Sequence, residues 1–151
     1  MVKKTKDIKY YEGVGRRKEA IARVRLYVTG KDKTVTLAGN KAKAGDILIN
    51  KKAADLTFPA ILEKNIYLLP LKLTKNDDRF VTTILLNGGG KAGQLDAIVL
   101  GLARALEKVD KETYRPILKK QGLFTHDSRT RERRKVGTGG KARRAKQSPK
   151  R

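Results

Sequence analysis

Alternation of hydrophobic and polar positions predicts two strands near the start of the chain. Residues 8–12 read as a short strand, residues 13–15 as a glycine turn and residues 19–29 as a longer strand. Two strands joined by a short glycine turn indicate an antiparallel hairpin. One face of the longer strand is apolar and the other carries arginines, so we expect one buried face. The apolar positions are Ala20, Ala22, Val24, Leu26 and Val28.

Short strand signals continue through the middle of the chain. Residues 34–37 and 46–50 are each predicted to form a short strand. Residues 79–87, rich in Val, Thr, Ile and Leu, predict a longer one. The strand at 79–87 follows a polar stretch at residues 74–78, which is typical of a turn.

The segment between these strands has a mixed pattern. A helical turn is expected from Ala53, and Pro59 is placed where a helix can begin. Residues 67–73 are apolar but contain Pro70. Because proline has no backbone N–H, this stretch is predicted to be a loop or an edge element.

Helical periodicity dominates the later part of the chain. Residues 94–108 place their large apolar side chains on one stripe, and residues 112–120 form a second, shorter helical pattern. Gly122 stands where a helix commonly ends. Leu123 and Phe124 are expected to hold the chain against the core before it leaves the body.

The last residues carry a dense positive charge. Residues 129–151 contain eleven Lys or Arg and one acid, Glu132, and the whole chain has a formal net charge of +22. This stretch cannot bury enough apolar surface to fold alone. A solvated, solubilising tail is one interpretation, but the many planar guanidinium groups favour phosphate binding. We expect a globular α+β domain over residues 1–124 and an extended basic tail over residues 125–151.

Charge and composition narrow the class of function. A strongly basic chain favours nucleic acid as partner over small acidic substrates. The chain has no cysteine, so neither a disulfide framework nor a thiolate zinc site is expected. It has no apolar run of about 18 residues, so no membrane span is expected. We predict a cytoplasmic protein without a cofactor.

The glycine stretch after residue 87 has three interpretations. Gly88, Gly90 and Gly93 fit the spacing of a dinucleotide fingerprint, but no parallel strand ending in an acid follows the helix. A Walker loop is excluded because Ala92 follows Lys91. The stretch then reads either as a tight turn that needs positive φ or as a set of exposed amides that, with Lys91, grip a phosphate. These last two interpretations are compatible.

A neighbouring His126, Asp127 and Ser128 do not predict a catalytic triad, because triad residues converge from separate segments. Asp127 and Ser128 are expected to form a turn or cap where the tail begins. With a single histidine and no cysteine, neither a catalytic nor a metal site is predicted.

Clusters of basic residues on the body are candidates for phosphate contact. Arg16, Arg17 and Lys18 lie together after the glycine turn. Arg104 lies on a helical stripe that can approach a phosphate backbone. Lys119-Lys120 are either phosphate ligands or partners of a helix dipole.

A series of short motifs, in order over nearly the whole chain, resembles the family of the ninth protein of the small ribosomal subunit in its bacterial form. The motifs include Gly-Arg-Arg-Lys-Glu-Ala at 15–20, Gly-Gly-Gly at 88–90, Gly-Gln at 93–94, Ala-Arg-Ala-Leu at 103–106, Leu-Lys-Lys at 118–120, Lys-Ala-Arg-Arg-Ala at 141–145 and the terminal Lys-Arg at 150–151.

This resemblance implies a fold, partners and roles for particular residues. The implied fold is a four-stranded sheet with helices packed on one side, as in the second-domain superfamily of ribosomal protein S-five. The implied partners are small-subunit ribosomal RNA, neighbouring proteins of the subunit head and the anticodon stem-loop of the tRNA in the peptidyl site. The residues expected to bind ribosomal RNA are Arg16, Arg17, Lys18, Lys91, Arg104, Lys119, Lys120, Arg129, Arg131, Arg133, Arg134, Lys135, Lys141, Arg143, Arg144 and Lys146. Those expected to contact the tRNA are Lys150 and Arg151.

The chain also departs from the family pattern. Lys91-Ala92 replaces the usual Leu-Ser, and Pro149 restricts the chain just before its end. Residues 36–46 read as an insertion of unassigned role. The resemblance predicts a structural protein without catalysis. A nucleic-acid-compacting protein that binds DNA by charge alone is the main alternative, and a nucleotide-dependent enzyme using the glycine turn is the third.

Overall fold

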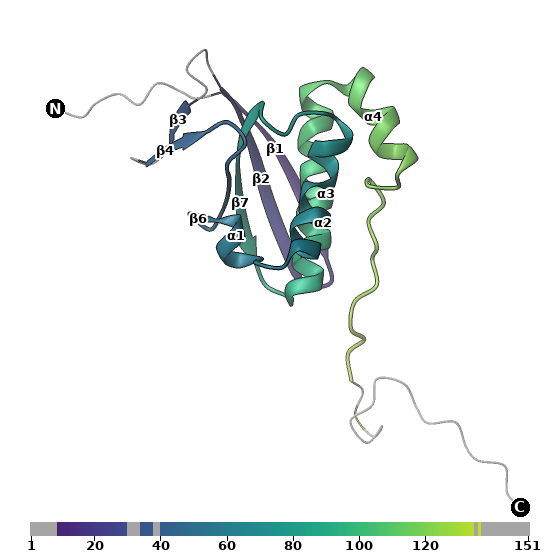
Figure 1. Ribbon diagram of the computed structural model, residues 1–151. Coiled ribbons are helices and arrows are strands. Elements are labelled where there is room, and N and C mark those ends of the chain that lie inside the picture. Colours follow the sequence, from purple (N-terminus) through teal and green to yellow (C-terminus); the bar gives the residue numbers. More distant parts are fainter. Residues whose placement is uncertain (1–8, 30–33, 38–39, 135, 137–151) are drawn as a thin grey trace, which may run out of the picture.

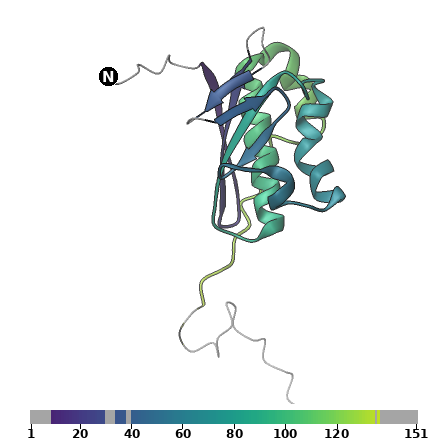
Figure 2. The same ribbon diagram turned by 60° about the vertical axis from the view of Figure 1, so that its left-hand side comes forward.

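The computed structural model describes residues 9–29, 34–37, 40–134 and 136. These residues form a mixed sheet with helices packed on one face (Figure 1), and the layers are seen edge-on in the turned view of Figure 2. The strands are β1 Tyr10–Arg17, β2 Ala20–Val28, β3 Thr34–Leu37, β4 Asn40–Lys43, β5 Ile47–Ile49, β6 Lys52–Ala53 and β7 Phe80–Asn87. The helices are α1 Ala54–Thr57, α2 Ile61–Leu73, α3 Lys91–Val109 and α4 Lys111–Lys120.

The main sheet has the strand order β1-β2-β7-β5-β6. β2 is antiparallel to both β1 and β7, β5 runs parallel to β7, and β6 is antiparallel to β5. The expected α+β sheet with helices on one side is confirmed in outline. In the described part of the chain it has five strands rather than the expected four, because Lys52–Ala53 adds a two-residue pairing to β5.

The predicted glycine turn between the first two strands is wrong. Gly13 and Gly15 lie inside β1, and the turn is made by Lys18 and Glu19, with Lys18 at φ 53°. A Cβ added at Gly15 would stand 1.9 Å from the carbonyl oxygen of Ala97 in α3. The glycines therefore let β1 lie directly against the backbone of α3. Close approach of another backbone is a common reason for glycine within a strand.

The prediction of a loop or edge element at residues 67–73 is also wrong, because these residues belong to α2. Pro70 lies inside the helix and removes the N–H that would bond to the Ile66 carbonyl. Tyr67, Pro70 and Leu71 are buried, and their packing offsets the lost bond.

The remaining helices and turns follow the sequence pattern. α3 begins at Lys91, three residues before the predicted Gln94. The Asp110 side chain caps α4 by accepting a hydrogen bond from the Thr113 N–H. The predicted stop at Gly122 is confirmed by its φ of 71°. Leu123 and Phe124 pack against the core as expected.

The main core lies between the sheet and its helices. Ala20, Ala22, Val24 and Leu26 of β2 are fully buried there, as their alternation predicts. Val28, the last residue of the strand, is 42% exposed and does not join them.

A second, smaller cluster lies on the opposite face of the sheet. Tyr27 and Val81 pack there against Val35 of β3 and Ala42 of β4. The hairpin of β3 and β4 includes part of the segment read as an insertion, so this segment covers one end of the open face.

Beyond Phe124 the described chain continues to residue 134 without helix or strand. It runs away from the body as an extended segment (Figures 1 and 2). None of the helices in the described part of the chain is long and apolar enough to cross a membrane.

Candidate nucleic-acid interface

Three segments that are far apart in sequence meet at one end of the sheet. They are the β1–β2 turn, the glycine loop 88–90 and the start of the extended segment. A Cβ added at Gly88 would stand 2.5 Å from the Glu19 carbonyl oxygen, so the loop contacts the turn directly. The Arg17 side chain joins the turn to Asp127. Basic residues from all three segments therefore share one end of the molecule.

The glycine loop makes a tight turn onto an uncapped helix. Gly88 and Gly89 have φ of 71° and 67°, which confirms the interpretation that positive φ is required. Gly90 precedes α3 without a side-chain cap, and the first turn of α3 has no acidic residue. Lys91 is exposed beside these amides. Such a helix start favours an anion, through its amides and the helix dipole.

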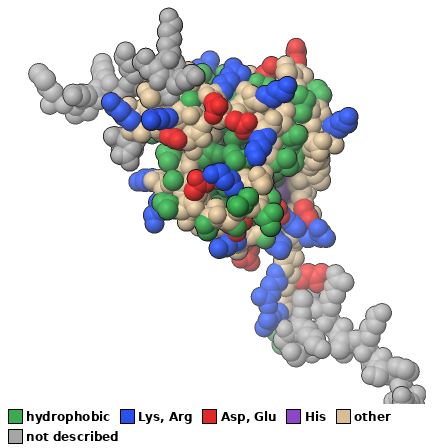
Figure 3. Space-filling model, in the orientation of Figure 1, with side chains coloured by type: hydrophobic (Ala, Val, Ile, Leu, Met, Phe, Trp, Pro, Cys, Tyr) green, Lys and Arg blue, Asp and Glu red, His purple; other side chains and the backbone are tan. Residues whose placement is uncertain are grey.

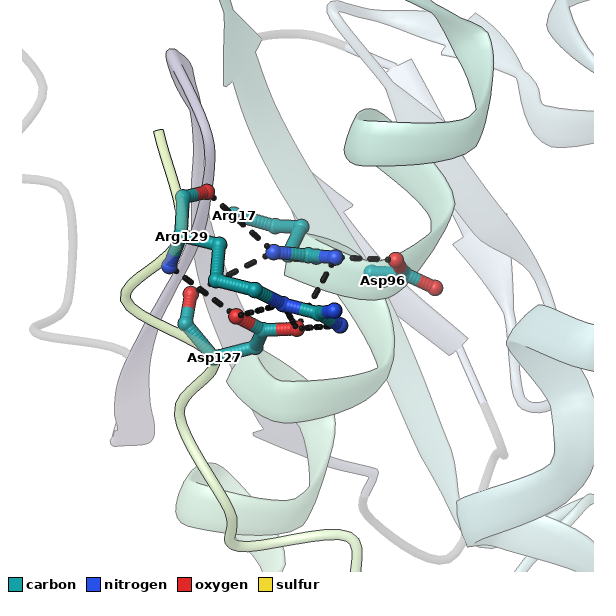
Figure 4. Close-up of polar contacts among 4 residues, drawn as sticks. All are labelled: Arg17, Asp96, Asp127 and Arg129. Atoms are coloured by element: carbon teal, nitrogen blue, oxygen red, sulfur yellow. Dashed lines mark hydrogen bonds and ion pairs between the residues drawn. The ribbon is translucent and has the colours of Figure 1, made fainter. Parts of the chain in front are cut away.

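Arg17 lies at the centre of a cluster of charged groups (Figure 4). Its Nε donates to Oδ2 of Asp96 at 3.3 Å, and its Nη2 lies 3.0 Å from Oδ2 of Asp127. Its Nη1 donates to the backbone carbonyls of Asp127 and Arg129 at 3.5 and 3.4 Å. The side chain is only 15% exposed. The guanidinium of Arg17, which the sequence predicted to bind phosphate, therefore binds acceptors of its own chain.

Asp127 forms the expected turn at the start of the tail. Its Oδ1 accepts a hydrogen bond from the Arg129 N–H at 2.9 Å, which confirms its predicted local role. Hydrogen bonds from the Arg129 side chain, followed by that backbone bond, hold the pKa of Asp127 well below its usual range. The Arg17 charge lowers this pKa further. The carboxylate is therefore ionised at neutral pH, and the same contact raises the pKa of Arg129.

The two basic neighbours of Arg17 differ from it in exposure. Arg16 pairs across the hairpin with Ile21 on the open face of the sheet and is exposed. Lys18 is exposed in the turn itself. Both stand where a phosphate can reach them.

Arg104 has a structural partner. Its Nη1 donates to the Val14 carbonyl oxygen at 2.6 Å, which ties α3 to β1. Arg104, predicted to approach a phosphate backbone, thus binds the edge strand β1 instead.

The other predicted ligands are placed as follows. Lys119 and Lys120 are exposed in the last turn of α4. The exposed basic residues of the extended segment are Arg129, Arg131, Arg133 and Arg134. Lys135, Lys141, Arg143, Arg144, Lys146, Lys150 and Arg151 lie outside the described residues.

Two interactions of basic residues were not predicted from sequence. Asp96 was not identified as a partner of Arg17, because nothing in a sequence signals a contact over 79 positions. Arg25 on the open sheet face donates from Nε to Oε2 of Glu12 at 2.7 Å and lies 4.7 Å from the Tyr10 ring. The hydrogen bond with Glu12 raises the pKa of Arg25. The strand alternation placed arginine on this face but gave no sign of these partners.

Catalytic and metal chemistry find no support in the described part of the chain. His126 is exposed, and the Asp127 carboxylate binds Arg17 and Arg129 (Figure 4). Within the same residues no group of three or more His, Cys, Asp or Glu side chains could hold a metal ion.

The fold and this basic end define a class: a small, basic α+β protein with an extended cationic segment. The chain belongs to the Ribosomal protein S9/S16 family, whose model matches residues 15–151. It is 43% identical over 142 residues to the small ribosomal subunit protein uS9 of Dehalococcoides mccartyi strain CBDB1, covering 94% of this chain and 96% of that one. The uS9 protein of Bifidobacterium animalis subsp. lactis is 42% identical over 139 residues, covering 92% and 76% of the two chains. The family expected from the motifs is thereby confirmed.

Proposed function

We propose that this protein is a structural constituent of the small ribosomal subunit that binds small-subunit ribosomal RNA, without catalysis of its own. The observation that carries the proposal is the meeting of three segments at one end of the body: the β1–β2 turn with the exposed Arg16 and Lys18, the glycine loop that leads to Lys91, and the start of the basic segment. Membership of the S9 family and the near full-length likeness to uS9 proteins support it. Its site is the ribosome, in the cytoplasm.

Binding would proceed through backbone phosphates rather than through bases. The uncapped start of α3 supplies amide donors, and Lys91 supplies a charge beside them. Each phosphate neutralised by Lys or Arg releases condensed counterions, so affinity should fall steeply with salt. The exposed arginines of residues 129–134 extend this surface along the segment.

The end of the chain is proposed to reach the tRNA in the peptidyl site. Lys150 and Arg151 are the residues assigned to its anticodon stem-loop. The family match extends to residue 151, which supports retention of this terminal feature. The same family relationship supports placing the body in the subunit head, next to other head proteins. It also supports the proposed likeness of the fold to the second domain of S-five. The parallel pairing of β5 with β7 is consistent with that likeness.

The test is the position of the native protein in a sucrose gradient of cell lysate at physiological magnesium, detected by antibody. We expect it in the small-subunit and whole-ribosome fractions only. High salt weakens contacts between basic side chains and phosphates, so it should release the protein from those fractions. Protein at the top of the gradient, or with chromosomal DNA, would contradict the proposal and favour a charge-driven DNA-compacting protein.

A further inference from the structure

Arg17 connects three parts of the chain that the sequence keeps apart. It is the last residue of β1, and it contacts Asp96 on α3 and the segment at residues 127–129. All three nitrogens of its guanidinium have an acceptor within the protein (Figure 4). Few donors remain for a phosphate, so its role differs from that of its neighbours.

Strand geometry separates Arg17 from Arg16. Successive side chains of a strand point to opposite faces. Arg17 pairs with the buried Ala20, on the face covered by α3, whereas Arg16 pairs with the exposed Ile21. Two adjacent arginines with the same charge thus have different surroundings, which makes Arg16 a matched control for Arg17.

The contact with Asp127 follows other attachments of the same segment. Leu123 and Phe124 pack on the core, and the Leu123 N–H donates to the Leu118 carbonyl at 3.1 Å. These contacts hold the chain just after α4. The Arg17 cluster then holds residues 127–129, immediately before the run of exposed arginines.

We propose that Arg17 is a positioning residue that fixes where and in which direction the basic C-terminal segment leaves the body. Asp96 fixes the guanidinium from the side of α3. The guanidinium then binds the carboxylate of Asp127 and the carbonyls of Asp127 and Arg129, so the backbone at this point has one path. Any effect of that path on RNA binding rests on the proposed function. The contacts of Arg17 with Asp96, Asp127 and Arg129 are independent of that function.

The test measures the path directly in the free, full-length protein. The chain has no cysteine, so a K108C and T130C pair gives two unique sites for spin labels on exposed residues of α3 and of the segment. We expect one narrow distance distribution from pulsed electron paramagnetic resonance. R17A should broaden it, and R16A, which removes the same charge, should leave it narrow. Equal distributions for R17A and R16A would overturn the proposal.

A second variant covers the case in which R17A disturbs the hairpin. D127N keeps β1 intact and removes the charge of the acceptor, so it should also broaden the distribution. R17K keeps the charge but replaces the planar guanidinium, whose three nitrogens bind four acceptors, with an ammonium that has three donors on a single nitrogen, so its distribution should lie between those of the wild type and R17A. A narrow distribution in D127N would overturn the proposal.

Salt titrations of binding to small-subunit ribosomal RNA separate this inference from the proposed function. R16A should reduce the slope of log affinity against log salt by about 0.7 to 0.9, as for one lost phosphate contact. R17A should leave the slope unchanged. An R17A slope reduced as much as that of R16A would make Arg17 a phosphate ligand and overturn the inference, while the proposed function would stand. Failure of the unmodified protein to bind this RNA would instead contradict the proposed function and leave the distance result valid.

Discussion

At the residue scale, the surroundings of a side chain decide its role more than its type does. Arg16, Arg17 and Lys18 read alike in the sequence, yet Arg17 is occupied by two carboxylates and two carbonyls while its neighbours are exposed. Burial acts in the same way on Tyr67. It is 2% exposed, and its hydroxyl donates to Oδ1 of Asp55 at 3.1 Å.

Tyr67 should make stability depend on alkaline pH. Burial, with the Asp55 charge and hydrogen bond, raises the pKa of Tyr67 to about 12 from the ordinary tyrosine value of 10.0. The unfolded chain therefore loses this proton first, and the free energy of unfolding should fall as pH rises from about 10 to about 12. Tyr67→Phe removes this titration, so its loss of stability over the range should be smaller. Denaturant unfolding at several pH values measures the difference, and equal losses in both proteins would contradict the expectation.

At the element scale, close packing of β1 on α3 organises the body. The two elements touch through glycines: a Cβ at Gly13 would stand 2.3 Å from the Gly101 carbonyl oxygen, and one at Gly15 would be closer still to that of Ala97. The hydrogen bond from Arg104 to the Val14 carbonyl also links α3 to β1. This packing also holds the β1–β2 turn next to the start of α3, and so brings the basic residues of the two together.

Gly15→Ala should therefore be destabilising. A methyl group cannot fit 1.9 Å from a backbone oxygen, so strand and helix must separate, at a cost of about 1 to 3 kcal/mol or more. Gly90→Ala is the control, because a Cβ there has nothing within 4 Å and φ is −104°. It should cost less than about 1 kcal/mol, the size of a cap effect. Chemical denaturation measures both, and similar losses would show that the β1–α3 approach tolerates a side chain.

At the scale of the whole molecule, charge is divided between a structured body and a basic extension. Lys and Arg side chains are scattered over the visible face of the body, including the end where residues 125–134 depart (Figure 3). Residues 129–151 carry the densest positive charge in the sequence. Such a division suits a protein whose body binds one site on RNA and whose chain continues to another.

Removal of residues 149–151 should weaken binding of tRNA in the peptidyl site of assembled subunits. With the proposed assignment of Lys150 and Arg151, this truncation should cost about 1.5 to 3 kcal/mol of binding free energy, roughly ten- to 150-fold in affinity. Filter binding of tRNA to purified subunits measures this.

The matched control for the truncation is the double variant K119A/K120A, which also removes two charges but from the exposed end of α4. It should leave tRNA affinity unchanged. Equal tRNA affinity for truncated and unmodified subunits would contradict the assignment of the tail tip.

The sequence by itself determined the elements whose pattern is local. Local patterns predicted four features: the alternation of β2, the apolar stripe of α3, the helix end at Gly122 and the turn at Asp127. Each depends on neighbours within a few positions, so it can be recognised from the sequence alone. The motif order likewise determined the family. The two glycines of β1 and the proline of α2 were assigned wrongly, because the features that explain them are the close approach of α3 and the burial of Pro70 in the core.

Only the tertiary structure decided which basic residues are free to bind. The pairing of β5 with β6 and the cover of the open face by β3 and β4 depend on segments meeting in space. So does the binding of Arg17 to Asp96 and Asp127, over 79 and 110 positions of sequence. Long-range contacts of this kind follow from the packing of the whole chain, since no local pattern encodes the distance between two charges.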